Sequence, residues 1–223
     1  MILYHIIWDL VYILNLSIPW YHSYIAFLWQ QSICCTFILL SGFCWSFGKH
    51  HFKREIIIFA GGMLITVITL IFMPEKRVVF GILTLLGSCM IFMIPLEKIL
   101  KKVPDILGVC ISLVLFIITR NINKGFLGIG SLNFIKLSDK LYNGLIATYF
   151  GFTEKMFFST DYFSIFPWIF LFVSGYFMNR VWKRKDFKVK SFSLKPVRII
   201  GKHSLAIYLL HQPLIYLVLY IAI

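Results

Sequence analysis

Long runs of apolar residues alternate along this chain with short polar and basic segments. About 20 consecutive apolar residues span the hydrocarbon core of a bilayer, so such runs are typical of transmembrane helices. The pattern predicts an all-α fold, a polytopic integral-membrane bundle of about seven transmembrane helices in a single domain over residues 1–223. The expected helices occupy residues 1–16, 24–47, 55–73, 78–96, 106–119, 162–178 and 199–223.

The first expected helix is shorter than the others. At 1.5 Å per residue, a run ending at Leu16 rises only ~24 Å, against a hydrocarbon core of ~30 Å. No polar residue precedes the run to anchor its inner end. We therefore expect the biological protein to begin upstream of Met1, so that the helix as given is truncated.

The segment between the fifth and sixth expected helices, residues 120–160, is long and mixes polar with apolar residues. Loops of this length without structure of their own are uncommon. Irregular backbone at membrane depth is tolerated only where protein buries it or where it lines a cavity. We therefore expect a re-entrant or interfacial helix in this segment.

Positive charge is concentrated in particular loops. The chain has 22 lysines and arginines against 9 acidic residues, a net charge of +13. Fifteen of the 22 basic residues follow the second, fourth and sixth expected helices. Basic loops stay in the cytoplasm, which predicts a cytoplasmic N-terminus and an external C-terminus for a multi-pass protein of the plasma or bacterial inner membrane. The basic residues lie in segments between apolar runs, where membrane topology places them, and this argues against nucleic acid as a partner.

The sequence shows no spacing typical of a metal site. The five cysteines lie inside apolar runs without paired ligand spacing, which predicts free thiols. The adjacent His50 and His51 lie in a basic loop with no third ligand nearby, and we expect them to be solvated. No metal is therefore expected.

The opening stretch Met1–Leu10 carries two ionisable residues, His5 and Asp9, in an otherwise apolar run. Four residues apart on a helix, they share one face. Ionisable groups in a bilayer normally face a bundle interior or a water-filled cavity, and they mark function by default. A wet, interfacial position near the helix end is the structural alternative for Asp9. Histidine is the stronger candidate of the two because it titrates near neutrality.

Asp161 and Trp168 flank the start of the sixth expected helix and are candidates for lining the same site. The structural alternatives are a helix N-cap for Asp161 and an interfacial anchor for Trp168. Pro167 between them suits the beginning of a helix.

The last apolar run places polar residues at membrane depth. His211 lies ~15 Å along the helix from Gly201, near mid-membrane, and is followed by Gln212 and Pro213. We expect His211 and Gln212 to line a cavity, where His211 meets His5 if the first and last helices are neighbours. A hydrogen bond between packed helices is the alternative for His211.

Five stretches, in this order along the chain, resemble the catalytic domain of heparan-α-glucosaminide N-acetyltransferase within the wider group of transmembrane acyltransferases. The strongest is the last one, and together they cover nearly the whole chain. They are M-I-L-Y-H at 1–5, F-I-L-L-S-G at 37–42, F-G-I-L at 80–83, D-Y-F-S-I-F-P-W at 161–168 and G-K-H-S-L-A-I-Y-L-L-H-Q-P at 201–213.

The resemblance implies transfer of an acyl group, usually acetyl from cytoplasmic acetyl-CoA, to the amine or hydroxyl of an envelope sugar or glycan. The family's first-helix histidine falls on His5, which would act as general base or transient acyl acceptor. Asp9 would orient it, as the third member of a triad does. Arg198 and Lys202 are the cations best placed to bind the CoA phosphates; the structural alternative is that they only set topology.

Two positions depart from the family pattern. The arginine motif that precedes the first-helix histidine lies outside the chain, and Thr84 occupies a position where the family often has histidine. Two further interpretations therefore remain: a transporter or flippase using His5, Asp9 and His211 as a relay, and a catalytically inactive scaffold. The sequence also allows a homo-oligomer.

Overall fold

The structure is a computed structural model that describes residues 1–12, 14–48, 51–130, 132–185, 199–201 and 203–221. The chain divides into two compact units, and each is described by itself. Unit 1 comprises Met1–Thr36 and Lys188–Ile223, and unit 2 comprises Phe37–Phe187. The expectation of one domain over the whole chain stays a prediction.

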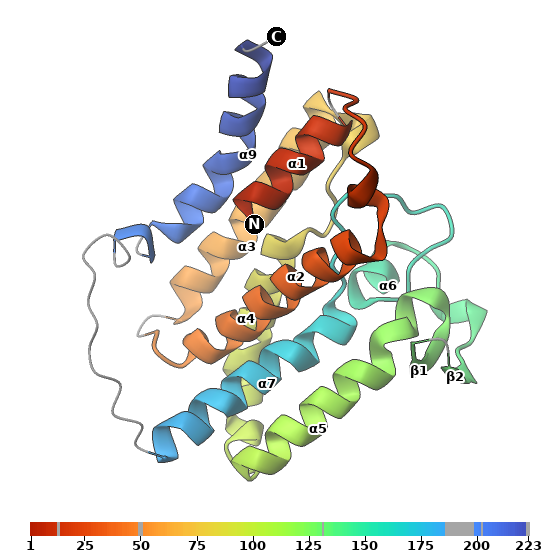
Figure 1. Cartoon of the computed structure of the whole chain (residues 1–223). Helices are drawn as coiled ribbons and strands as arrows, with labels where there is room; N and C mark the ends of the chain where they lie inside the picture. Colours follow the sequence, from red (N-terminus) through yellow and green to blue (C-terminus); the bar gives the residue numbers. More distant parts are fainter. Residues whose placement is uncertain (13, 49–50, 131, 186–198, 202, 222–223) are drawn as a thin grey trace. The chain divides into compact units, whose positions relative to one another are not determined.

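Each of the seven expected helical segments contains an α-helix in the described residues, so the all-α fold is confirmed (Figure 1). The α-helices are α1 Ile2–Tyr12, α2 Tyr24–Trp45, α3 His51–Phe72, α4 Ile82–Leu100, α5 Asp105–Ile118, α6 Leu145–Phe150, α7 Ile165–Arg184 and α9 Ser204–Ile221; the 3₁₀-helices are η1 Pro19–His22, η2 Pro74–Lys76, η3 Thr119–Lys124 and η4 Asp139–Leu141; the strands are β1 Phe126–Ile129 and β2 Leu132–Lys136.

Several of these helices suit a membrane. Within the described residues, four are long and apolar enough to cross a bilayer by length and composition, and α1 and α9 are shorter apolar helices. The four spans are Tyr24–Trp45, Phe52–Phe72, Ile82–Leu100 and Asp105–Lys124. The chain is therefore a helical membrane protein, while the crossing of the remaining helices stays a prediction.

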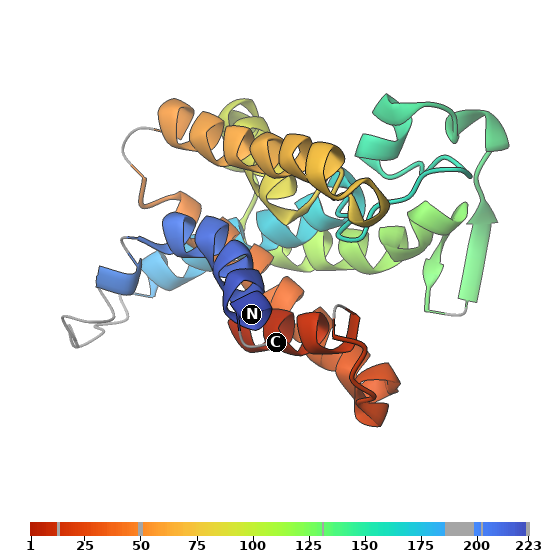
Figure 2. The same ribbon diagram turned by 90° about the horizontal axis from the view of Figure 1, so that it is seen from above.

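Glycines allow the helices of unit 2 to approach one another closely. α3 and α4 lie side by side (Figures 1 and 2), and a Cβ on Gly87 of α4 would lie 2.6 Å from backbone atoms of Phe59 on α3. α2 and α7 cross at Gly42 and Gly175, where a Cβ on either would collide with the backbone of the other helix. Small residues at such crossings are how helices pack in a bilayer, where apolar burial gives no driving force.

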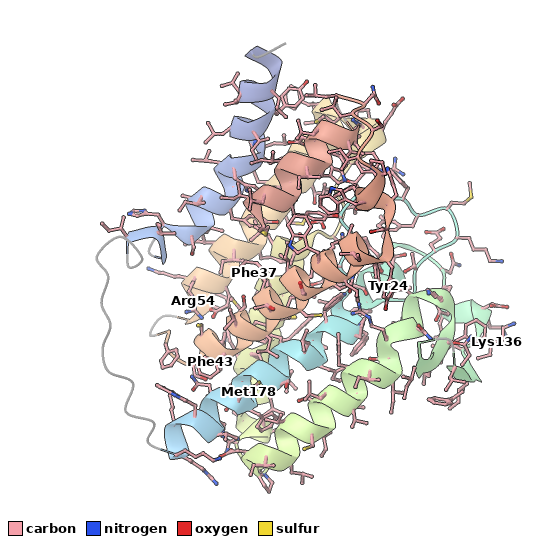
Figure 3. All side chains as sticks on the ribbon, in the orientation of Figure 1. Tyr24, Phe37, Phe43, Arg54, Lys136 and Met178 are labelled. Atoms are coloured by element: carbon pink, nitrogen blue, oxygen red, sulfur yellow. The ribbon has the colours of Figure 1, made fainter. Side chains whose placement is uncertain are left out.

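Described residues from the three basic segments lie at one end of unit 2. Arg180 of α7 donates to the carbonyl oxygen of Leu100 at 2.8 Å, joining the end of α7 to the α4–α5 turn. Lys183 of α7 lies over the ring of Phe47, just after α2, at 5.0 Å. Figure 3 places Arg54 and Phe43 toward this end and Lys136 at the opposite end. Consecutive transmembrane helices cross in opposite directions, so every second loop lies on the same side of the membrane, as these basic loops do.

A cluster of ion pairs stabilises the same end of unit 2. The buried carboxylate of Asp105, the first residue of α5, accepts contacts from Arg180 at 2.8 Å and from Arg184 at 2.7 Å. A buried charge is tolerated when it is paired in this way. The cluster ties the beginning of α5 to the end of α7.

The start of α4 differs from the prediction. The apolar run predicted a helix from Val78, but α4 begins at Ile82. The preceding residues run beside the segment at 158–163: the N–H of Val79 donates to the Ser159 hydroxyl at 2.9 Å, and that of Phe163 donates to the Phe80 carbonyl oxygen at 2.8 Å. Pairing with this distant segment replaces the first turn of the expected helix.

The segment at 120–160 holds an antiparallel hairpin, β1–β2, and the six-residue helix α6 (Figure 2). The hairpin was not expected, whereas a short helix in this segment was. Gly130 forms the turn with a positive φ of 59°, a conformation that favours glycine. Tyr142 anchors the segment by donating its hydroxyl hydrogen bond to the Ile122 carbonyl oxygen at 2.6 Å.

Unit 1 is built from α1, η1, the beginning of α2 and α9. Its small core consists of Val11, Tyr21 and Ala26. α1 and α9, the two ends of the sequence, lie side by side (Figures 1 and 2) and are joined by the contacts described below.

Candidate active site

Two histidines from the two ends of the sequence face each other in unit 1. His5 on α1 and His211 on α9 have ring centroids 4.9 Å apart. The sequence predicted this meeting on the condition that the two helices are neighbours, and the structure meets that condition. Their catalytic roles stay a proposal.

A second contact joins the same helices one turn along α1. The side-chain amide of Gln212 donates to Oδ1 of Asp9 at 2.9 Å, and Asp9 is fully buried. Asp9 and His5 share the face of α1 that meets α9, as their four-residue spacing predicted. The carboxylate is thus buried in the contact between the helices and is not exposed to solvent, while its depth in the membrane stays a prediction.

His211 is oriented by its own helix. Its Nδ1 lies within hydrogen-bond distance of the Tyr208 carbonyl oxygen, three residues earlier. The residue is only 8% exposed, and its Nε2 has no hydrogen-bond partner among the described residues. Oε1 of Gln212 is also buried without such a partner there. Buried polar atoms normally have partners, so these two atoms are candidates for contact with a substrate or an ordered water.

Aromatic side chains border the histidine pair. The ring of Tyr4 lies 5.8 Å from His5, 5.8 Å from Tyr21 and 5.4 Å from Trp29. Tyr208 contacts His211 with ring centroids 5.4 Å apart. The imidazoles therefore lie in a largely aromatic setting within unit 1, with Asp9 as the nearby carboxylate.

Asp161 lies in unit 2 and acts at the beginning of α4. Its Oδ2 accepts from the N–H of Ile82 at 3.5 Å, and Gly81 lies against the same carboxylate. The N-cap alternative is therefore wrong for the helix that follows Asp161, because Ser164 is the N-cap of α7; Asp161 instead accepts from the first N–H of α4. Burial raises the pKa of the Asp161 carboxyl to about 6, against the opposing effect of this hydrogen bond.

This carboxyl gives a pH-dependent stability. An aspartate of the unfolded chain titrates near 3.8, so the folded protein binds the proton more tightly, and stability falls as pH rises from about 4 to about 6. Asp161→Asn retains an oxygen acceptor for Ile82 without the charge. We expect the thermal midpoint of the variant to decline less than that of the wild type over this range, by a few degrees. Equal declines in detergent-solubilised wild type and variant would contradict this assignment.

Trp168 is buried near the beginning of α7, also in unit 2. Its ring packs against Phe163 at 5.2 Å and Phe116 at 5.5 Å, and the Arg120 guanidinium lies over it at 4.6 Å. These contacts give Trp168 a packing role at the end of unit 2 that carries the hairpin, while its place at a membrane interface stays a prediction. A role in lining a substrate site stays a prediction for Asp161 and Trp168.

Thr84, which stands where the family often has histidine, lies at the crossing of α3 and α4. It is buried, and a Cβ on Gly62 of α3 would lie 2.5 Å from its Oγ1. The crossing leaves no room between these two residues. Thr84 is therefore a packing residue in unit 2.

The cations expected to bind CoA phosphates, Arg198 and Lys202, lie outside the described residues. Of the same basic loop, Arg180 and Arg184 are engaged with Asp105. The part of the chain that the structure describes contains no group of three or more side chains that could hold a metal ion.

Two features of the histidine site were missed by sequence reasoning. The Tyr208 carbonyl oxygen that orients His211 is backbone, and only its position three residues earlier on a helix could have suggested it. The direct bond between Asp9 and Gln212 was also missed, although both residues had been placed at membrane depth.

Comparison with known proteins agrees with these observations. The family model described as heparan-alpha-glucosaminide N-acetyltransferase, catalytic, matches residues 1–213, from before the His5 position to just beyond Gln212. Neither the curated proteins nor the solved structures that were compared gave a match. The matched region includes nearly the whole chain, and the family is one of membrane acetyltransferases. The chain therefore belongs to the heparan-α-glucosaminide N-acetyltransferase catalytic family.

Proposed function

We propose that this protein transfers an acetyl group from cytoplasmic acetyl-CoA to an amine or hydroxyl of an envelope sugar or glycan. In this reaction the acceptor oxygen or nitrogen bonds to the acetyl carbon, the carbon–sulfur bond breaks, and the acceptor proton ends on the CoA sulfur. His5 serves as general base or transient acyl acceptor, and Asp9 and Gln212 hold its surroundings in place.

The observation that carries the proposal is the pairing of His5 and His211 beside a buried carboxylate. Ionisable groups are costly in a bilayer and persist where they serve a function. An imidazole that is neutral near pH 7 has a lone pair available to accept a proton or to attack a thioester. The family assignment supplies acetyl transfer as the reaction class.

The proposed orientation has the N-terminus and the basic loops in the cytoplasm and the C-terminus outside. The grouping of the basic segments at one end of unit 2 supports it. Arg198 and Lys202 are then on the side where acetyl-CoA is available. Because Arg180 and Arg184 are paired with Asp105, they are weaker candidates for binding the phosphates.

The test uses membrane vesicles of both orientations, with glucosamine enclosed as acceptor and labelled acetyl-CoA added outside. Inside-out vesicles should release CoA and accumulate labelled N-acetylglucosamine, and right-side-out vesicles should not. Vesicles without the protein are the control. Glucosamine movement that depends on a proton gradient, without CoA release, would favour the transporter interpretation instead.

A further inference from the structure

The hydrogen bond at His211 fixes which ring nitrogen carries the proton. A carbonyl oxygen only accepts hydrogen bonds, so the contact between Nδ1 of His211 and the Tyr208 carbonyl oxygen requires Nδ1 to donate. A neutral imidazole has one N–H and one lone pair. With the proton on Nδ1, the lone pair lies on Nε2.

This lone pair accepts no hydrogen bond from any of the described residues. Nε2 of His211 is buried and has no hydrogen-bond partner among the described residues. The neighbouring groups from the beginning of the chain include the His5 ring, 4.9 Å away between centroids, Asp9, which accepts from Gln212, and the Met1 amino group. A buried acceptor atom is normally satisfied, so Nε2 points to a donor that the described residues do not provide.

We infer that Nε2 of His211 is the base that takes the proton from the sugar hydroxyl or amine, an assignment that rests on the proposed acetyl transfer. As the proton moves to Nε2, the acceptor oxygen or nitrogen bonds to the acetyl carbon. The bond from that carbon to its carrier breaks, and His211 returns the proton to the carrier. The carrier is the His5 nitrogen, which takes the acetyl group from CoA in a preceding step while its own proton passes to the CoA sulfur, so His5 is the transient acyl acceptor of the proposed function.

The Tyr208 carbonyl oxygen has a defined part in this step. When Nε2 accepts the proton, His211 becomes an imidazolium, and the carbonyl oxygen accepting from Nδ1 stabilises its charge. The backbone carbonyl therefore stabilises the protonated form of His211, as the carboxylate of a catalytic triad stabilises the protonated histidine. His211 is thus a catalytic residue, a stronger role than lining a cavity.

The kinetic test compares two substitutions of His211 in the full chain. His211→Asn retains a side-chain N–H that can reach the Tyr208 carbonyl oxygen but has no base. Loss of a general base costs roughly 10²–10⁴-fold, so we expect His211→Asn and His211→Ala to lose acetyl transfer by that factor. Imidazole added to His211→Ala should restore part of the rate, which a purely structural role would not allow.

Leu210→Ala is the matched control on α9, since Leu210 is largely exposed. It should retain the wild-type rate. A His211→Asn variant within a few-fold of wild type would overturn the assignment, as would a folded His211→Ala variant that imidazole does not rescue.

A second measurement is independent of activity. In bilayers, ¹⁵N-histidine NMR of the full chain should show a protonated Nδ1 and an unprotonated Nε2 for the signal that His211→Asn removes. The opposite tautomer, or a doubly protonated ring at neutral pH, would overturn the assignment. Absence of acetyl transfer in the wild type would instead count against the proposed function, so the two failures are distinguishable.

Discussion

Replacing His5 with alanine should reduce acetyl transfer by roughly 10²–10⁴-fold while leaving the protein folded. The His5 ring on α1 faces the His211 ring on α9, so the substitution removes one of the two paired imidazoles. His5 is half-buried, and the small core of unit 1 is formed by other residues. The measurement is the rate of acetyl transfer at equal protein, with thermal unfolding to establish that the variant is folded.

The control for His5 lies two residues earlier on the same helix. Leu3 is 68% exposed, and Leu3→Ala should leave the rate unchanged. If His5→Ala matched the wild type, His5 would have no part in the mechanism. An inactive scaffold would then be the better description if the wild type were also inactive.

A leucine at position 175 should disrupt the α2–α7 crossing. A Cβ at Gly175 would already lie 2.8 Å from the Phe43 backbone nitrogen and closer still to the Leu39 carbonyl oxygen. Backbone atoms cannot rotate away as side chains do, so the helices must separate. Overpacking typically costs about 1–3 kcal/mol, and we expect at least that loss in Gly175→Leu, seen as a lower thermal midpoint and a lower yield of folded protein.

Gly201→Ala provides the comparison for this prediction. No atom lies within 4 Å of a Cβ placed on Gly201, so its replacement should leave the midpoint unchanged. Gly42→Ala, on the other side of the crossing, should be destabilising as well, since its Cβ would meet the Phe172 backbone. Wild-type midpoints for both crossing variants would show that the two helices are not in contact.

The helices could be predicted from the sequence because each apolar run is bounded by polar, basic or proline residues nearby. α5 illustrates this: it was expected at 106–119, after Pro104, and is observed at Asp105–Ile118. The information that determines such a helix lies within it and at its two ends.

The start of α4 could not be predicted in this way. Val78 to Phe80 continue the apolar run, but Val79 and Phe80 pair with residues about 80 positions later, and Phe80 adopts a positive φ of 57°. The identity of a pairing segment is not encoded in the local pattern of apolar residues. The same reason explains why the partner of Asp161 was missed, since Ile82 is a backbone donor on another helix.

The histidine site was predictable in part. Helical spacing placed His5 and Asp9 on one face, and helical rise placed His211 at membrane depth. Neither rule predicts the side-chain rotamer of His211. This rotamer brings Nδ1 of His211 to the Tyr208 carbonyl oxygen. The proton position that follows from that rotamer therefore required the structure.

The contacts between α1 and α9 also bear on when the histidine site forms during synthesis. Asp9 and Gln212 are 203 residues apart, so the α1 part of the site leaves the ribosome well before the α9 part. Contacts of such long sequence separation form late, because the intervening chain must be in place before they close. A chain arrested after α7 has every residue of unit 2 up to Arg184 but only one of the two imidazoles. A product that ends there lacks the pairing of His5 with His211, and we expect it to lack any activity that depends on both rings.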